Sequence, residues 1–407
     1  NGGNILTEPD QDYFLQNNLG FPNTKAGKSD WRREQVNFLI EDISDAIKTF
    51  NQANNRYVQF GISPTGIYRN GDGIVTYDGE GMPITSGSLT QGQEHYASYL
   101  FADSLKWIKE GWLDYILPQS YWASTHPIAG YPEVMGWWDK VVRYLDVNLY
   151  SGIGVYMADA SPASEVYSWR NNPNEFKNQL AFLETLDNVS GFSIYSYNMV
   201  RSEYQGAAIA SATQIKNARS AYWQNIAILP ELKSMTPVHL PSVTNVLHNA
   251  GTGKLTFDAQ AGAKFYYIYR SDAPLTYEND EIIAVIPNTG GPTIEWNAND
   301  FNASHHYGVR SLSGTNHLSP AFVSDVPAPT YQFSGTFDGL KFTSPAVLTL
   351  ISANDIVYSM DGVIWQNYTE PINVNWNGNH TVYYKAIDQD SSESDINVVH
   401  FEVAMFN

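Results

Sequence analysis

The chain has 407 residues, which is too long for one ordinary domain and predicts two or three. Asp and Glu number 42 against 23 Lys and Arg, and a formal net charge of −19 argues against binding a nucleic-acid backbone. No cysteine is present, which excludes disulfide frameworks, zinc–thiolate sites and thiol catalysis. The sequence also lacks the run of about 18 apolar residues that a membrane-spanning helix needs, so we expect no membrane span.

The first part of the chain, to about residue 229, alternates between helical and strand-like patterns. Asp30 is a candidate cap for a first helix that continues to Phe50, because apolar residues recur there at steps of three and four. The elements expected after it, in chain order, are a strand at 57–63, a helix at 94–110, a strand at 114–121, a helix at 133–145, a strand at 148–157, a helix at 173–186, a strand at 190–197 and a last helix that ends near Trp223.

These strands are rich in Ile, Tyr and Val on both faces and alternate with helices, which predicts a parallel sheet. Doubly wound sheets and β/α barrels both fit this pattern. Each strand ends in polar or aromatic residues, and the active-site groups of β/α barrels lie at that end of the strands, so we favour the barrel. Four strands are expected here, whereas a closed barrel of this type has eight.

From about residue 230 onward the helical periodicity stops, and proline clusters mark the expected linkers. Residues 230–327 predict one β-sandwich, with strands at 254–257, 265–270 and 306–311. Residues 328–407 predict a second, with strands at 356–360, 363–365, 381–387 and 398–403 and a turn at Asp361-Gly362. The expected domains are therefore 1–229, 230–327 and 328–407.

Several stretches of the first region carry a resemblance to a known family. They read DWRREQVN (residues 30–37), FGISPTGIYRN (60–70), DSLKW (103–107), GWLDYI (111–116), PQSYW (118–122), WW (137–138) and NLY (148–150). In order and spacing they resemble the bacterial glycosyl hydrolase-like 10 family, a β/α-barrel group, over about residues 12–225. The resemblance implies that these residues form the C-terminal half of a (β/α)8 TIM-type barrel. It also implies that the first half, with an acidic strand motif, precedes position 1.

The two expected sandwiches carry weaker resemblances. Residues 266–271 and 307–311 resemble the paired strands of fibronectin type III modules. Residues 358–362, Trp365 and residues 380–386 resemble the Ig-like accessory sandwich of chitobiase-type proteins. Both resemblances imply modules that act as spacers or in adhesion and that carry no catalytic residues.

Candidate substrate-binding residues lie at or just after the ends of the expected strands. Aromatic faces stack on the C–H face of a sugar, and amide, hydroxyl and guanidinium groups bind its hydroxyls or a carboxylate. The alternative for the aromatic residues is a core cluster that closes the rim, and for Arg69 an ion pair that braces its loop. The candidates are Ser63, Arg69, Gln119, Tyr121, Trp122, Tyr156, Tyr195, Tyr197 and Asn198.

Few carboxylates can reach this rim, and a glycosidase needs two of them. Asp72, Asp159 and Glu203 are the catalytic candidates, although each is also readable as a solvated loop charge. Asp72 belongs to a Gly-rich loop, residues 71–93, that is long enough to be a lid. The nine histidines form no metal-ligand pattern, and we expect neither a metal nor a cofactor.

The resemblance implies a glycoside hydrolase-like protein that acts on a bacterial envelope polysaccharide or another polysaccharide by carboxylate acid/base hydrolysis, with retention or inversion left open. The alternative is a non-catalytic glycan-binding or cell-surface structural protein. Low charge, many aromatic residues and no cysteine favour an extracellular or cell-surface location. The expected partner is a polysaccharide or oligosaccharide. Because the first half of the barrel is absent, the chain on its own is expected to be inactive, and a homodimer or the missing N-terminal fragment is expected to complete the barrel.

Overall fold

A computed structural model shows a chain that divides into two compact units, Asn1–Pro237 and Val238–Asn407. Each unit has hydrophobic clusters of its own. The structure describes residues 7–97, 100–160, 167–207, 209–249, 253–272, 275–297, 305–321, 329–362, 364–387, 393–394 and 396–405.

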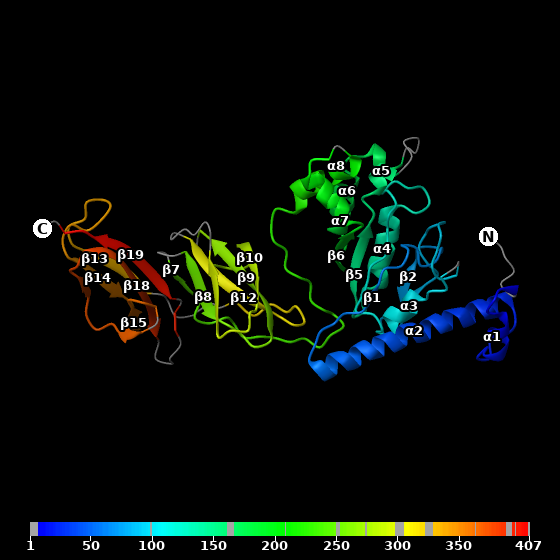
Figure 1. The fold of residues 1–407 in the computed structure, drawn as a ribbon, viewed down its shortest axis with the longest axis horizontal. Coiled ribbons are helices and arrows are strands. Elements are labelled where there is room, and N and C mark those ends of the chain that lie inside the picture. Colours follow the sequence, from blue (N-terminus) through cyan, green and yellow to red (C-terminus); the bar gives the residue numbers. More distant parts are fainter. Residues whose placement is uncertain are drawn as a thin grey trace. The chain divides into compact units, whose positions relative to one another are not determined.

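The first unit is built around a four-stranded parallel sheet (Figure 1). Its strands are β1 (Gly61–Ile62), β4 (Tyr115–Ile116), β5 (Asn148–Ile153) and β6 (Val189–Ile194). They lie side by side in the order in which the chain makes them, β1-β4-β5-β6. The chain therefore winds across the sheet in one direction, without the reversal of strand order that defines a doubly wound sheet.

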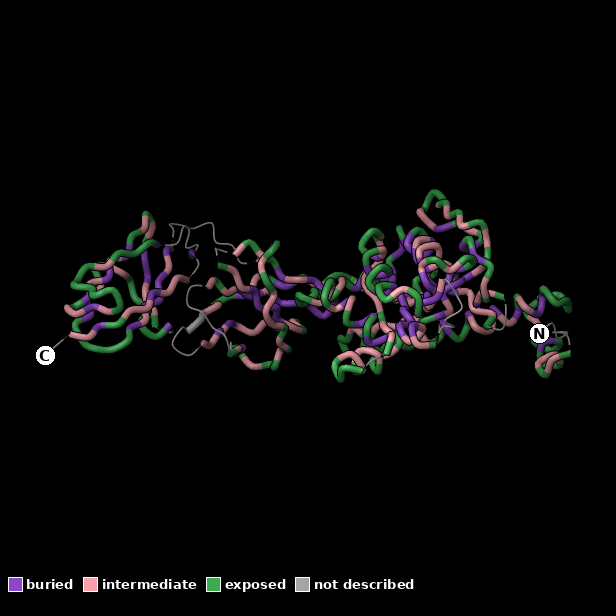
Figure 2. Tube along the Cα trace, turned by 90° about the horizontal axis from the view of Figure 1, so that it is seen from above, coloured by how far each residue is buried: buried purple, intermediate pink, exposed green. Residues whose placement is uncertain are grey.

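Helices cover one face of this sheet and close the core. Ile116, Leu149 and Ile153 point to that face and are fully buried, because they pack against Trp137 and Trp138 of α4 and their neighbours. Figure 2 shows that buried residues, in purple, gather inside this unit while exposed residues lie along its outside. The helices of the unit are α1 (Gln11–Gln16), α2 (Lys25–Asn54), α3 (Ser104–Lys109), α4 (Tyr131–Val141), α5 (Met157–Ala160), α6 (Glu175–Leu183), α7 (Tyr197–Tyr204) and α8 (Ala210–Tyr222), with a 3-10 turn at Trp169–Asn171.

The opposite face of the sheet carries aromatic side chains that lie over glycines. Tyr115 and Tyr150 meet edge to face on it, with ring centroids 5.7 Å apart. A side chain at Gly61 would collide with the Tyr115 ring, and one at Gly191 would touch Tyr150. Both tyrosines are half-buried, so this face is open to solvent in the described chain.

Two helix starts differ from the sequence prediction by more than two residues. The predicted start of the first helix at Asp30 is wrong: Thr24 caps α2, because its hydroxyl accepts a hydrogen bond from the Gly27 amide at 3.0 Å. The helix predicted from residue 94 begins only after Asp103, whose carboxylate caps α3. The backbone of His95 bonds instead to Ile67, so that stretch cannot be helical.

The second unit contains two pairs of packed antiparallel sheets. In the first pair, β10 (Glu281–Pro287), β9 (Ala263–Ser271) and β12 (His306–Ser313) face β11 (Thr293–Asn297), β8 (Lys254–Asp258) and β7 (Leu247–Asn249). Phe257 of one sheet and Tyr266 of the other are buried together between the sheets, with ring centroids 4.9 Å apart. This is the arrangement of a β-sandwich.

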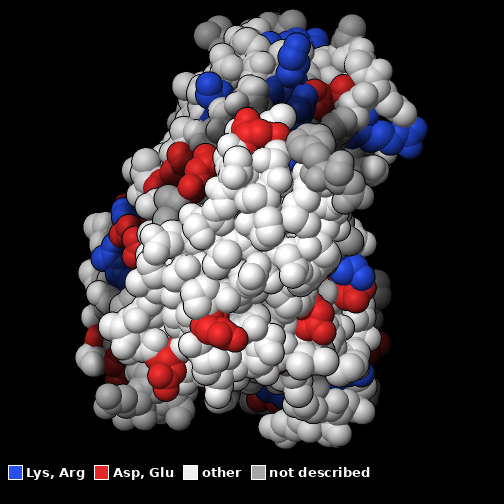
Figure 3. All heavy atoms as spheres, turned by 90° about the vertical axis from the view of Figure 1, so that its left-hand side faces the viewer, with Lys and Arg blue, Asp and Glu red and all other residues white. Residues whose placement is uncertain are grey.

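The second pair has a separate core, in which Leu348 and Val382 are fully buried. One sheet is β13 (Thr330–Ser334), β14 (Ala346–Ile351) and β17 (Ile372–Val374), and the other is β16 (Gln366–Asn367), β15 (Asp355–Ser359), β18 (Gly378–Ile387) and β19 (Asn397–Val403). Figure 3 views the chain from this side, where acidic side chains are scattered among uncharged residues.

The coarse fold prediction is confirmed: helices with a parallel sheet, followed by antiparallel β-structure. The boundary predicted at 327/328 lies outside the described residues, and the one at 229/230 stays a prediction. A two-stranded hairpin of β2 (Val75–Tyr77) and β3 (Pro83–Thr85) occupies the long loop 71–93. None of the described helices combines the length and apolar character needed to cross a membrane.

Candidate functional site

Three tyrosines meet just beyond the C-terminal ends of β4, β5 and β6. Tyr121 and Tyr195 stack with ring centroids 6.1 Å apart and an interplanar angle of 28°. They follow strands that are not neighbours, so their rings must meet above β5. Gly154 makes this contact possible: a Cβ atom there would lie 2.7 Å from the Tyr121 ring.

Tyr156 completes the group, which we call the tyrosine cluster (Tyr121, Tyr156 and Tyr195). Its ring contacts Tyr121 and Tyr195 edge to face, at centroid distances of 6.0 and 5.8 Å. Tyr195 keeps 60% of its surface exposed, so the cluster presents an aromatic face to solvent. Burial, with smaller contributions from Tyr156 and Tyr195, raises the pKa of Tyr121 to about 12, so its phenol stays neutral at physiological pH. The cluster can therefore stack on a sugar and hydrogen-bond to it.

Ser63 and Gln119 tie the ends of β1 and β4 together. The Gln119 amide donates to the Ser63 carbonyl at 2.8 Å, and the Ser63 hydroxyl donates to the Leu117 carbonyl at 2.9 Å. The backbone of Gln119 also forms parallel β-bridges with Thr65 on one side and with Gly152 on the other, as a strand residue does. Both side chains lie on the same face as the tyrosine cluster, but their described hydrogen bonds serve the sheet.

Arg69 lies with a different group of residues. Its guanidinium is 4.5 Å from the centre of the Tyr96 ring, and the guanidinium of Arg33 in α2 is 4.1 Å from the same centre. Arg33 is also paired with Asp30, whereas no described carboxylate pairs with Arg69. The structure thus holds Arg69 by a cation–π contact, and no described contact joins it to the tyrosine cluster.

The remaining candidates are placed apart from the cluster. Trp122 points to the helix-covered face, as strand alternation predicts, and packs beside Gly66 at the core. Tyr197 does not continue the alternation of Tyr195, because β6 ends at Ile194 and α7 begins at Tyr197. Tyr197 is 74% exposed, and Asn198 is exposed beside it in the first turn of α7.

The three candidate carboxylates each hold local structure. Asp72 accepts hydrogen bonds from the Ile74 amide and the Ser86 hydroxyl, which lower its pKa and keep it ionised. Asp159 accepts from the Ala210 amide at the start of α8, at 2.8 Å. Glu203 is nearly buried and pairs with Arg219 at 2.7 Å. A carboxylate with a lowered pKa is a poor general acid at neutral pH, which weighs most against that role for Asp72.

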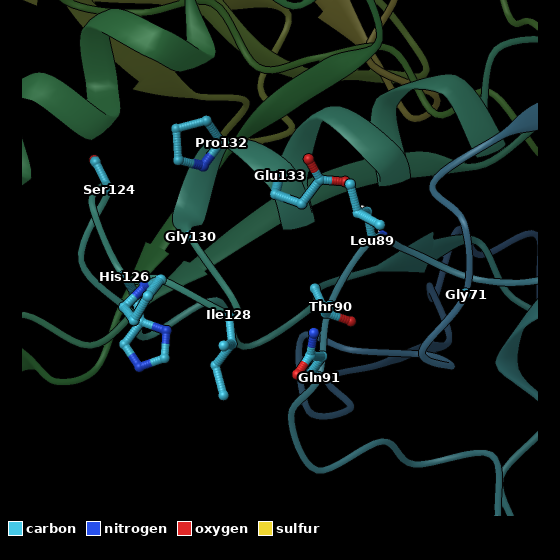
Figure 4. Close-up of a pocket in the computed structure, with 11 residues that line it drawn as sticks. Gly71, Leu89, Thr90, Gln91, Ser124, His126, Ile128, Gly130, Pro132 and Glu133 are labelled. Carbon is cyan, nitrogen blue, oxygen red and sulfur yellow. Dashed lines mark hydrogen bonds between the residues drawn. The ribbon is translucent and has the colours of Figure 1, made fainter.

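A cavity of about 670 Å³ lies between the loops that follow β1 and β4, and the sequence did not reveal it. Figure 4 shows Leu89, Thr90 and Gln91 on one side, Ser124 and His126 on the other, and Glu133 at the start of α4. The backbone amide of Leu89 donates to Glu133 Oε1 at 3.3 Å, and the backbone amide of Gln91 donates to the Ile128 carbonyl at 3.0 Å.

The sequence signals for this cavity were the long loop 71–93 and the helix start at Pro132-Glu133, but nothing in the sequence shows that the two meet. Within the described chain, no three or more His, Asp or Glu side chains are placed to hold a metal ion. The tyrosine cluster offers aromatic faces and the cavity offers polar side chains, which suit organic ligands bound by stacking and hydrogen bonds.

Comparison with known proteins agrees with the resemblance seen in the first region. Residues 7–169 match the family described as Glycosyl hydrolase-like 10. Glycosyl hydrolase DigH of Escherichia coli (strain K12) is 34% identical over 172 residues, 42% of this chain and 36% of that protein. Glycosyl hydrolase YngK of Bacillus subtilis (strain 168) is 29% identical over 251 residues, 60% of this chain and 44% of that protein. The chain thus spans less than half the length of these relatives.

Among solved structures, the fibronectin(III)-like modules of Clostridium thermocellum CbhA align with 38% of this chain and 87% of that chain, at 13% identity and a TM-score of 0.14. The resemblance to the glycosyl hydrolase-like family is confirmed. The first region of this chain is similar in sequence to proteins named glycosyl hydrolases.

Proposed function

We propose that the first unit is part of a β/α barrel whose tyrosine cluster binds a polysaccharide, and that the protein is a glycoside hydrolase-like enzyme. One observation carries the proposal: Tyr121, Tyr156 and Tyr195 form one aromatic face at the C-terminal ends of three neighbouring strands. In β/α barrels this end of the sheet carries the active site. The proposed location is outside the cytoplasm, where such polymers are found.

The order of the strands supports the barrel. Neighbouring strands follow one another in the sequence, and among the described residues the hydrophobic cluster that joins helices to the sheet lies on the face of Ile116, Leu149 and Ile153. A doubly wound sheet would have helices on both faces. Under this proposal, the open face with Tyr115 and Tyr150 is the inner face of the barrel.

An alternative function is glycan binding without hydrolysis. It is favoured by the roles of Asp72, Asp159 and Glu203, which hold a loop, a helix start and an ion pair respectively. The stacking surface needs no carboxylate, so binding and hydrolysis are separable properties of this site.

The test measures binding to insoluble and soluble polysaccharides together with the release of reducing ends. We expect Tyr195→Ala and Tyr121→Ala to weaken binding about fivefold, because an aromatic stacking contact contributes about 1 kcal/mol. Gly154→Ala should act in the same direction, since a Cβ atom displaces the Tyr121 ring. Tyr144→Ala, at an exposed tyrosine after α4, is the matched control and should leave binding unchanged.

The same assay separates the two functions. Loss of reducing-end release by about a hundredfold or more in Asp72→Asn, Asp159→Asn or Glu203→Gln, with binding retained, supports hydrolysis. Binding without any release supports the alternative. If the tyrosine variants bind as well as the unaltered chain, the proposed site is wrong.

We propose further that the outer edges of β1 and β6 are paired in the functional assembly, by a second copy of the chain or by another polypeptide segment. In the described chain β1 pairs only with β4, and β6 only with β5. Unpaired strand edges favour association. Sedimentation equilibrium should show a concentration-dependent dimer if a second copy supplies the pairing, and a monomer at all concentrations contradicts that form of the proposal.

A further inference from the structure

The cavity beside Glu133 has the dimensions and the walls of a small-molecule site. Its volume of about 670 Å³ falls in the range of about 300–1,000 Å³ that such sites occupy. Its two sides come from loops far apart in sequence, which the Leu89–Glu133 and Gln91–Ile128 hydrogen bonds hold together. The site is therefore built from the fold and not from one flexible loop.

Charge restricts what the cavity can bind. Among the described residues that line it, Glu133 carries the one carboxylate, and none is Lys or Arg. An anionic ligand would meet this half-buried negative charge with no compensating cation, so anions are disfavoured. A ligand with several hydroxyl groups suits the carboxylate, because charge-assisted hydrogen bonds are the stronger kind.

Two polar groups of the cavity have hydrogen-bonding capacity to spare. Glu133 Oε2 and the side-chain amide of Gln91 make no hydrogen bond to any described residue, whereas Glu133 Oε1 is used by Leu89. His126 is oriented by the Ala129 backbone amide, which donates to its Nδ1 at 3.1 Å. Donor and acceptor groups thus surround the space in Figure 4.

Apolar side chains complete the walls. Leu89 is 62% exposed and Ile128 42% exposed, so both side chains offer apolar surface to a ligand in the cavity. The C–H face of a pyranose ring is a suitable cover, while its hydroxyl edge reaches Glu133 and Gln91.

We propose that this cavity is a second carbohydrate site, separate from the tyrosine cluster, and that it binds one uncharged pyranose unit with Glu133 as the acceptor for its hydroxyls. The choice of a sugar over another neutral polyol rests on the proposed function. The charge selectivity and the location rest on the cavity alone.

The experiment follows methyl signals of Leu89 and Ile128 by NMR in the full chain, with the ring signals of the exposed Tyr195 as the reporter for the tyrosine cluster. The probes are methyl β-D-glucoside and methyl β-D-glucuronide, a matched pair that differs in one carboxylate. We expect the glucoside to shift Leu89 and Ile128 saturably, and the glucuronide to bind about fivefold more weakly, the effect of one nearby like charge in a watery site.

Variants assign the selectivity to Glu133. Glu133→Gln keeps an acceptor for the Leu89 amide and should abolish the difference between the two probes, whereas Glu110→Gln, the same change at the exposed end of α3, should preserve it. Gln91→Ala should weaken both probes equally, which keeps the test open if Glu133→Gln fails to fold.

The inference is overturned if the glucoside leaves Leu89 and Ile128 unshifted at tens of millimolar, or if the glucuronide binds as tightly as the glucoside. If the glucoside shifts Leu89 and Ile128 in a chain whose tyrosine cluster binds no polysaccharide, the proposed function is wrong and the second site is still supported. The reverse pattern would remove the second site alone.

Discussion

At the scale of single residues, the tyrosine cluster depends on a residue that has no side chain. Tyr121 and Tyr195 belong to strands separated by β5, and parallel neighbours are about 4.8 Å apart, so their rings must cross a full strand to meet. Gly154 is the position they cross, and it leaves the space that a Cβ atom would fill. The aromatic face is therefore set by strand register and one glycine, not by the tyrosines alone.

His95 gives the first unit a pH-dependent stability. It is fully buried, its Nδ1 lies 3.0 Å from the Thr65 carbonyl and its Nε2 lies 2.7 Å from the Ser104 hydroxyl. Burial lowers its pKa to about 4. The unfolded chain binds this proton near pH 6.5 and the folded chain only near pH 4, so stability falls as the pH drops through that window. The free energy of unfolding is expected to fall by about 3 kcal/mol across this window.

Urea unfolding followed by tryptophan fluorescence measures this, because eight of the 11 tryptophans lie in the first unit. His95→Gln should be less stable at pH 7.5 but should lose less stability than the unaltered chain on going to pH 5. His306→Gln, at an exposed histidine of β12, is the control and should leave the pH dependence unchanged. An equal pH dependence in His95→Gln would show that another group titrates in this range.

At the scale of elements, the sequence predicted the kinds of element better than their ends. The helix ending near Trp223 was correctly predicted, because its apolar period is uninterrupted. The start of α2 was missed: both Thr24 and Asp30 are good caps, and only the packing of Lys28 and Trp31 in the folded chain shows that the helix already runs through them. Local propensity cannot choose between two adequate caps.

For the candidate site too, the sequence predicted the features that depend on local periodicity and missed those that depend on where strands end and on which loops meet. Period-two alternation correctly placed Gln119 and Tyr121 on one face and Trp122 on the other. It misplaced Tyr197, because the chain enters α7 directly after β6. The cavity beside Glu133 was beyond prediction, since it needs a loop after β1 to reach a helix start about 40 residues later, and no local pattern encodes that contact.

At the scale of the whole molecule, the chain has independent hydrophobic cores. The largest cluster joins the parallel sheet to its helices and includes Ile116, whereas the first sandwich buries Ile268 in a cluster of its own. The division of the chain at Pro237–Val238 separates these cores. Cores that share no residues are expected to lose their structure in separate cooperative steps.

Differential scanning calorimetry of the full chain should accordingly show more than one transition. Ile116→Ala should lower the temperature of the transition that tracks tryptophan fluorescence, and Ile268→Ala should lower another, because each leaves a buried cavity that costs about 2–5 kcal/mol. Each variant serves as the control for the other. If either substitution shifts all transitions together, the units are coupled by contacts strong enough to unfold them as one, and a polysaccharide bound at the tyrosine cluster would then stabilise the sandwiches as well.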